Sequence, residues 1–180
     1  MTEKSGKESR LSGYRSRRDQ FFAQHAHSPL TPEQRSAFSG LNYFPEREEL
    51  VMELALDDSG PGTGEEVKLD TTDGQQKTFY RAGRISFEHD GHQITLTVLR
   101  DGVRGSLFIP FRDANAGEET YSVGRYLEPR LRPDGTIEVD FNYAYNPFCA
   151  YGDGWSCPIP PVENQLETSI QAGERKFQVP

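Results

Sequence analysis

The sequence predicts a mainly β protein, either an antiparallel β-sandwich or a partly open β-barrel, with two short N-terminal helices. From residue 50 onward, short runs of Val, Ile, Leu, Thr, Phe and Tyr are separated by turn residues. The dipeptide Asp-Gly, a preferred pair for tight hairpin turns, occurs five times there, starting at residues 73, 90, 101, 134 and 153. Polar and apolar residues also alternate within several runs, which indicates strands with one solvent-facing side.

Two helices are predicted before these strands. Aromatic residues at helical spacing predict an amphipathic helix over residues 14–26. The run from Thr31 to Gln34 is a strong start for a second helix, because Thr can cap it, Pro favours its first position and Gln can bond back to the cap amide. Gly40 is predicted to end this second helix.

The apolar runs that follow predict eight strands. We expect them at residues 50–56, 66–71, 77–81, 84–89, 92–99, 104–111, 119–127 and 136–142. Three or four of the Asp-Gly pairs should form hairpin turns between them. Residues 57–64, rich in Gly, Ser and Asp, are predicted to form a flexible loop.

Length and charge predict one domain with few classes of partner. The 180 residues suit a single β-rich domain over residues 14–180, preceded by a disordered basic arm of residues 1–13. The formal charge of the chain is −8, although residues 1–18 hold six Lys or Arg against two Glu, so the remainder carries −12. Such a body repels nucleic acid and anionic lipid, and neither is expected as a partner.

The compartment predicted from the sequence is the cytoplasm. No apolar run approaches the roughly 18 residues that a membrane span needs, and the N-terminus lacks the apolar region of a secretory signal. Cys149 and Cys157 are expected to be unpaired packed thiols, with a disulfide or redox pair and half of a zinc site as alternatives. No histidine lies near them, and a metal bridging His89 and His92 is only weakly indicated, so no metal or cofactor is predicted.

The loop that follows Phe108 carries an unusual density of charge. Arg112, Asp113, Glu119 and Arg125 are expected to meet at one end of the sheet. One interpretation is a pocket in which the arginines bind a carboxylate or phosphate and a carboxylate carries a proton. The other interpretation is a network of ion pairs that ties the loop down.

The segment from Asp140 to Asn164 forms the second half of the candidate site. It combines aromatic residues with three asparagines and both cysteines, which suits recognition of a polar small molecule. The alternative is that the Asn and Tyr side chains satisfy buried backbone groups. Across both halves, the candidate ligand-binding residues are Arg112, Tyr121, Arg125, Tyr126, Asn142, Tyr145, Asn146, Tyr151 and Asn164.

Three functions remain open from these residues. The leading hypothesis is a soluble domain that binds a small polar or anionic ligand in a pocket at one end of the sheet. The second is an enzyme of hydrolase or isomerase type that uses Asp113, Glu119 or Glu163 as general acid or base. The third is a protein-interaction module, which would expose an apolar surface patch.

Several segments taken together resemble a known family. They include Phe38 to Pro45, Pro110 to Asp113, Glu119 to Leu127, Asp140 to Tyr151 and Cys157 to Asn164. This combination is similar to an uncharacterised family of bacterial and archaeal proteins, domain of unknown function 1684, over about residues 15–175. The resemblance implies one domain with a shared central block, and it supplies no activity, cofactor or partner.

Overall fold

The N-terminal part of the chain forms the two predicted helices. The structure, a computed structural model, describes residues 9–178. Helix α1 spans Arg10–Gln24 and is capped by the hydroxyl of Ser9, which accepts a hydrogen bond from the Ser12 amide at 3.1 Å. The expected start at residue 14 was therefore too late, and residues 10–13 form the first turn of α1 instead of a disordered arm. Residues 1–8 of that arm lie outside the described residues.

Helix α2 spans Pro32–Ala37 and begins with the predicted capping box of Thr31 and Gln34. It ends three residues before Gly40, which was the expected end. Gly40 instead has φ +125° and packs against Asp19, whose carboxylate accepts the amide of Leu41 at 2.9 Å. The glycine therefore serves the contact between α1 and the following segment.

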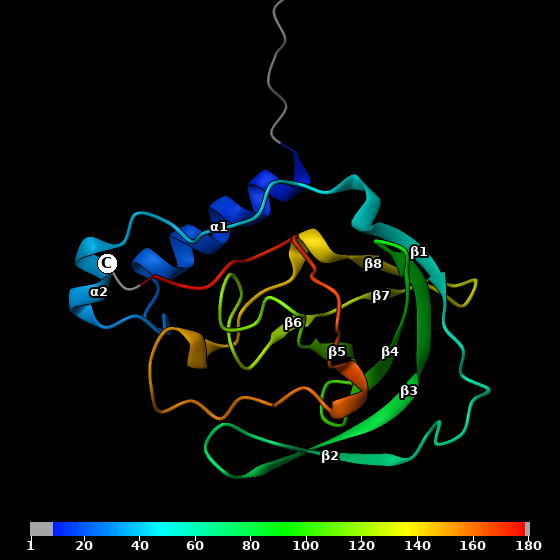
Figure 1. The fold of residues 1–180 in the computed structure, drawn as a ribbon. Coiled ribbons are helices and arrows are strands. Elements are labelled where there is room, and N and C mark those ends of the chain that lie inside the picture. Colours follow the sequence, from blue (N-terminus) through cyan, green and yellow to red (C-terminus); the bar gives the residue numbers. More distant parts are fainter. Residues whose placement is uncertain (1–8, 179–180) are drawn as a thin grey trace, which may run out of the picture.

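The strands form two antiparallel sheets, which confirms the predicted fold class. In the three-stranded sheet the order is β1 (Val51–Ala55), β8 (Thr136–Asp140), β7 (Arg130–Leu131). In the five-stranded sheet the order is β2 (Glu66–Asp70), β3 (Gln76–His89), β4 (His92–Asp101), β5 (Leu107–Phe111), β6 (Arg125–Leu127). Figure 1 shows the larger sheet curled into a half-barrel, with both helices lying at one side of it.

Several strand boundaries differ from the prediction. The expected strands at 77–81 and 84–89 are one strand, β3, whose register shifts between Arg81 and Gly83. The expected strand at 119–127 is shortened to β6, because Tyr121 to Gly124 forms a turn. Strand β8 stops at Asp140, since Phe141–Tyr143 forms a short 3-10 helix. Strand β7 was not predicted.

The Asp-Gly prediction is confirmed at four positions. Pairs starting at residues 73, 90 and 134 lie in the connections β2–β3, β3–β4 and β7–β8, and the pair starting at Asp101, the last residue of β4, begins the connection β4–β5. The tightest is the turn between β3 and β4, where Asp90 and Gly91 have φ of +50° and +74°. The fifth pair, starting at residue 153, lies in a loop between short 3-10 helices.

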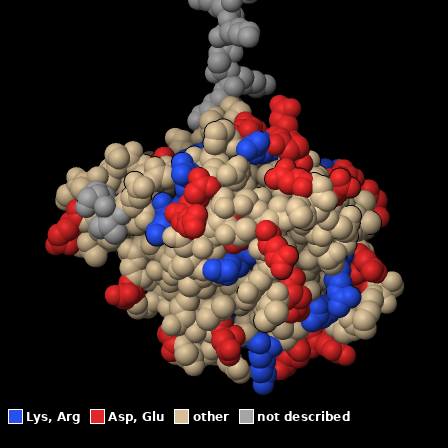
Figure 2. Space-filling view, viewed as in Figure 1, with Lys and Arg blue, Asp and Glu red and all other residues tan. Residues whose placement is uncertain are grey.

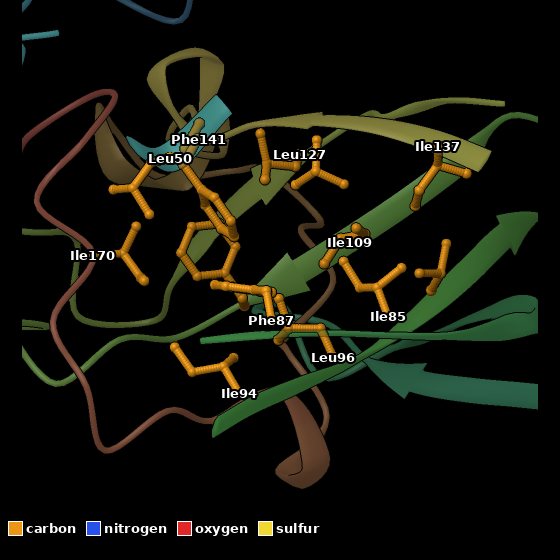
Figure 3. Packing of buried hydrophobic residues seen from close by; sticks show 14 of the residues in the cluster. Leu50, Ile85, Phe87, Ile94, Leu96, Ile109, Leu127, Ile137, Phe141 and Ile170 are labelled. Atoms are coloured by element: carbon orange, nitrogen blue, oxygen red, sulfur yellow. The ribbon is translucent and has the colours of Figure 1, made fainter. Parts of the chain in front are cut away.

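The main core draws side chains from both sheets. Phe141 lies at its centre, with its ring 5.4 Å from that of Phe111 and 5.6 Å from that of Phe87 (Figure 3). A second cluster around Phe79 and Phe108 fills the other end of the half-barrel. A third, centred on Phe22, joins α1 to the loops that carry the sequence motifs.

The two cysteines form a disulfide, so the expectation of unpaired thiols was wrong. Cys149 and Cys157 are eight residues apart in sequence, with their Cα atoms 6.5 Å apart. Within residues 9–178, no helix is long and apolar enough to cross a membrane.

Candidate functional site

The predicted acid–base candidate Asp113 is buried and fully paired. One of its carboxylate oxygens accepts the hydroxyl of Thr120 at 2.7 Å, and the other accepts the backbone amide of Ile170 at 2.9 Å. The Arg125 guanidinium lies 3.6 Å from the second oxygen. The Asp113 carboxylate is 2% exposed and lines neither of the two cavities described below, so it is not placed to meet a substrate.

Arg125 acts in the same way as an internal clamp. Its guanidinium is 1% exposed and donates to the carbonyls of Ala172, Ile170 and Glu174. Burial lowers the pKa of Arg125, while the negative charges of Asp113 and Glu174 oppose that shift. Because both terminal nitrogens of this buried cation donate to backbone carbonyls, Arg125 anchors the segment of residues 170–174 and does not present a fork to a ligand.

The other two carboxylate candidates lie near the surface and are also paired. Glu119 accepts hydrogen bonds from Asn115 at 2.7 Å and from Arg175 at 3.3 Å. Glu163 accepts from Arg81 at 3.1 Å. The geometry thus matches a network that fastens loops, and it does not support acid–base catalysis by Asp113, Glu119 or Glu163.

The side chains of two predicted asparagines bond to backbone groups in the way that a neighbouring backbone segment would. The side chain of Asn164 is fully buried and bonds the amide and carbonyl of Thr97 at 2.8 and 2.9 Å, and the carbonyl of Pro110 at 2.9 Å. Asn142 makes the same amide-and-carbonyl pair with Arg47. The polar groups of both side chains are therefore bonded to the backbone of the protein itself.

The remaining predicted residues do not converge on one space. Tyr126 donates to the carbonyl of Pro158, and Arg112 donates to the carbonyl of Ser122 at 2.9 Å. Tyr121 is half-buried, and its pKa is raised by burial and then by the charge of Asp153. Of the nine candidate ligand-binding residues, Tyr145 alone lines either of the two cavities described below.

Sequence reasoning missed a buried acid, Glu174, which holds several of these residues. Its carboxylate is paired with Arg18 at 2.9 Å and accepts hydrogen bonds from the Tyr151 hydroxyl and the Asn146 amide. Burial raises the pKa of Glu174, against the lowering effect of Arg18. One signal was present in the sequence, because Arg18 lies four residues from both Tyr14 and Phe22 on the apolar face of α1.

The larger cavity is a groove between α1 and the exposed side of the β1-β8-β7 sheet. We call it the α1 groove; its volume is about 880 Å³. Three half-buried tyrosines line it, and the rings of Tyr14 and Tyr143 are 4.8 Å apart. The third tyrosine is Tyr145, and the other lining residues are Ser9, Arg10, Leu11, Gly13, Arg17, Glu46, Val51, Leu127, Glu128, Pro129, Arg130, Glu138, Val139 and Asp140.

Charged side chains of both signs lie along the α1 groove without neutralising one another. Within residues 9–178, no ion pair involves Arg17, Arg130, Glu128 or Asp140. Burial raises the pKa of Tyr143, and the charge on Asp140 adds to that shift. Figure 2 shows that acidic and basic side chains are interspersed over one face of the molecule.

The second cavity is smaller and lies beside the β3–β4 hairpin. Its volume is about 260 Å³, and it is lined by Arg47, Glu49, Leu50, Glu88, His89, Asp90, Ser169 and Gln171. This is below the roughly 300–1,000 Å³ of typical ligand pockets. In the part of the chain that the structure describes, no three His, Cys, Asp or Glu side chains are grouped so as to hold a metal ion, at His89 or elsewhere.

Comparisons with known proteins place the chain in a family. A solution NMR structure of an uncharacterised protein from gene locus rrnAC0354 of Haloarcula marismortui is 42% identical, with a TM-score of 0.70, over 92% of this chain and 91% of that one. No protein in the curated set matches the chain. The family model described as "Protein of unknown function (DUF1684)" matches residues 36–175. The chain therefore belongs to the DUF1684 family, which its central motifs resemble.

Proposed function

We propose that this protein binds a small polar ligand in the α1 groove. The observation that carries the proposal is the set of charged side chains, among them Arg17, Glu128 and Asp140, which line the groove together with three tyrosines and make no ion pairs within residues 9–178. The groove volume of about 880 Å³ lies within the range of small-molecule sites. A ligand that supplies ionic partners to these side chains would therefore gain both contact area and orientation.

The groove differs from the pocket that the sequence predicts. That pocket was placed between the loop of Arg112 to Tyr126 and the segment of Asp140 to Asn164, and most of the predicted side chains there are hydrogen-bonded to backbone groups of the protein. Binding is favoured over acid–base catalysis, because each predicted carboxylate already has a partner. The exposed hydrophobic side chains, such as Val103 and Leu131, are spread over several elements, which gives a protein-interaction module less support.

A small ligand as partner agrees with the charge of the chain. A formal charge of −8 opposes binding to nucleic acid or to anionic membranes. The cytoplasmic location stays a prediction from the sequence, and the Cys149–Cys157 disulfide argues against a strongly reducing compartment.

The proposal is tested by ligand screening with a variant that fills the groove. Thermal unfolding of the wild-type protein is measured against a panel of small polar compounds, each at a concentration well above its expected dissociation constant. A bound compound at 100 times its dissociation constant stabilises the fold by about 2.7 kcal/mol and raises Tm. We expect Val51→Trp to remove that shift, because Val51 lines the groove and its side chain is 46% exposed.

Val103→Trp is the matched control. This residue is 97% exposed and lies away from the groove, so the variant should keep the full Tm shift. If no polar compound stabilises the wild-type protein, the proposed function is wrong. If a compound stabilises Val51→Trp and the wild-type protein equally, the ligand site lies elsewhere in the molecule and the groove assignment fails.

A further inference from the structure

The disulfide closes a loop whose two ends are held by different parts of the protein. The first end packs on the helices, where the ring of Phe22 in α1 lies 6.3 Å from that of Phe148 and 4.6 Å from that of Tyr151. The side chain of Gln34 in α2 donates a hydrogen bond to the Tyr151 carbonyl at 3.1 Å. Cys149 stands between these packed aromatic residues in the sequence, so it belongs to the helix end of the loop.

The second end bonds to the turn between β2 and β3. The Cys157 carbonyl accepts the Thr72 amide at 3.0 Å, and the Cys157 amide donates to the Thr72 hydroxyl at 3.2 Å. The hydroxyl of Ser156 donates to the Asp73 carboxylate at 2.9 Å. The disulfide therefore links the helix end of the loop to its sheet end by a bond that crosses the loop.

The two cysteines differ in their access to solvent. Cys157 is buried, with 7% of its surface exposed, whereas Cys149 is half-buried. A thiolate in solution meets Cys149 first, and exposed disulfides exchange with thiols more readily than buried ones. The ring is also short, because the cysteines are eight residues apart, and a short ring adds less stability than a long one. Loss of this bond is therefore expected to loosen the loop without unfolding the protein.

We propose that the Cys149–Cys157 disulfide is a reversible redox switch that sets how firmly α2 and the C-terminal half of α1 are held against the rest of the protein. The reductant is a dithiol. Its first thiolate attacks Cys149 Sγ, and the S–S bond breaks with its electron pair on Cys157 Sγ, which takes up a proton. Its second thiolate attacks the sulfur now bonded to Cys149, which leaves as a thiolate and also takes up a proton. Two electrons and two protons thus pass to the cysteines, and the dithiol becomes a disulfide.

Reduction changes the connection between the two ends of the loop. The hydrogen bonds of Thr72 stay at the sheet end, and the packing around Phe22 stays at the helix end. The rings of Phe148 and Trp155, with centroids 4.9 Å apart, then connect the two ends without a covalent bond across the loop. Because such an aromatic contact opens far more easily than a covalent bond, the helix end separates from the sheet end more often in the reduced protein.

Hydrogen exchange of backbone amides tests the switch on the wild-type protein. Exchange is followed by mass spectrometry in the oxidised protein, after reduction with dithiothreitol, and after reoxidation with oxidised glutathione; alkylation of free thiols reports the redox state. We expect reduction to speed exchange at least about fivefold in α2 and in residues 19–24 of α1. Exchange in β3 and β4 should stay within about twofold. Reoxidation should restore the original rates.

A variant without the disulfide is the matched control. The protein with both Cys149→Ser and Cys157→Ser should exchange like the reduced wild-type protein, and dithiothreitol should not change its rates. A response of this variant to dithiothreitol would show that the reductant acts elsewhere, and the inference would fail. The comparison of oxidised and reduced wild-type protein needs no substitution, so it stands even if the variant does not fold.

Three results in the wild-type protein would overturn the inference. The first is a disulfide that stays oxidised at dithiothreitol concentrations that fully reduce oxidised glutathione. The second is complete reduction with unchanged exchange in α1 and α2. The third is equal acceleration in the helices and in β3 and β4, because the disulfide would then stabilise the whole fold and not one connection. None of these results depends on whether the α1 groove binds a ligand.

Discussion

Buried amide side chains replace backbone hydrogen bonds at the places where the chain changes direction. Asn164 bonds both polar groups of Thr97 in β4 and the carbonyl of Pro110 in β5. The backbone pairing of β4 with β5 comprises Leu99 with Phe108 and Arg100 with Leu107, and the Asn164 side chain bonds to both strands beyond these pairs. The segment rich in Asn and Tyr suggested a ligand site. At this position, however, its Asn164 links β4 to β5 by hydrogen bonds.

The contribution of the Asn164 hydrogen bonds to the free energy of unfolding can be measured by mutation. Replacing it with Ala leaves one amide and two carbonyls buried without partners, at about 1–3 kcal/mol for each unsatisfied group, so Asn164→Ala should lower the free energy of unfolding by about 3 kcal/mol or more. Urea denaturation at constant m-value measures the loss. The neighbouring Gln165→Ala, at an exposed side chain, should change it by less than about 0.5 kcal/mol. Equal losses in both variants would contradict this role for Asn164.

Among the strands, β3 has a course that depends on Gly83 more than on its pattern of apolar residues. At Gly83 the register with β4 shifts, and the residues on either side of the shift pair in different ways. The adjacent Arg84 exchanges two backbone hydrogen bonds, both 2.9 Å, with Asp57 of the preceding loop. A Cβ atom at Gly83 would lie 2.5 Å from the carbonyl oxygen of Asp57. The bulge therefore lets the segment of Asp57 approach β3. It lies where the sequence pattern predicted two separate strands.

Gly83→Ala should accordingly destabilise the protein more than an ordinary turn substitution. The control is Gly135→Ala, because Gly135 also has positive φ, +85°, but nothing lies within 4 Å of an added Cβ. We expect about 1 kcal/mol for the conformational cost at Gly135 and about 2 kcal/mol more at Gly83 from the backbone clash. Chemical denaturation of both variants gives the two values. A loss at Gly83 no larger than that at Gly135 would mean that the Asp57 segment moves away without cost.

At the scale of the whole molecule, the ion pair of Glu174 with Arg18 joins segments that are far apart in the chain. Glu174, near the end of the described chain, meets Arg18 of α1 and Tyr151 of the disulfide loop, so three distant segments share its carboxylate. Burial acts to protonate Glu174, and Arg18 acts to keep it charged. Since the pKa is raised overall, desolvation is the stronger of the two effects.

This balance predicts a pH dependence with a definite sign. A carboxyl whose pKa rises on folding adds stability below its ordinary value of 4.5 and loses it as pH rises through the folded-state pKa. The free energy of unfolding of the wild-type protein, relative to Glu174→Gln, should therefore fall as pH rises above 4.5, with a slope of at most about 1.4 kcal/mol per pH unit. Urea denaturation of both proteins across this range measures the slope.

Arg18→Gln is the background that tests the cause. Without the guanidinium the desolvation of Glu174 is unopposed, so the decline should extend to higher pH. If the wild-type protein instead gains stability relative to Glu174→Gln as pH rises, the ion pair outweighs desolvation and our assignment of the dominant effect is reversed.

Local chemistry was enough to predict several elements. The capping box at Thr31, four hairpin turns at Asp-Gly pairs and the mainly antiparallel β class all follow from interactions within a few residues, and the structure confirms them. Strand boundaries that depend on contacts between distant segments were harder to predict from the sequence. The single strand β3 depends on Asp57, and the late start of β6 within the predicted strand at 119–127 depends on the preceding turn, which packs against Pro160 at Gly124.

The sequence by itself determined the fold class, the two helices, the family and the segments that are rich in polar and aromatic groups. Only the tertiary structure decided what those groups contact: Asp113, Arg125 and Asn164 bond inward to backbone and to one another, Cys149 and Cys157 pair, and the free charges lie under α1 instead. The physical reason is that residue type fixes how many hydrogen bonds a side chain must make, while its partners are set by packing between segments far apart in the chain.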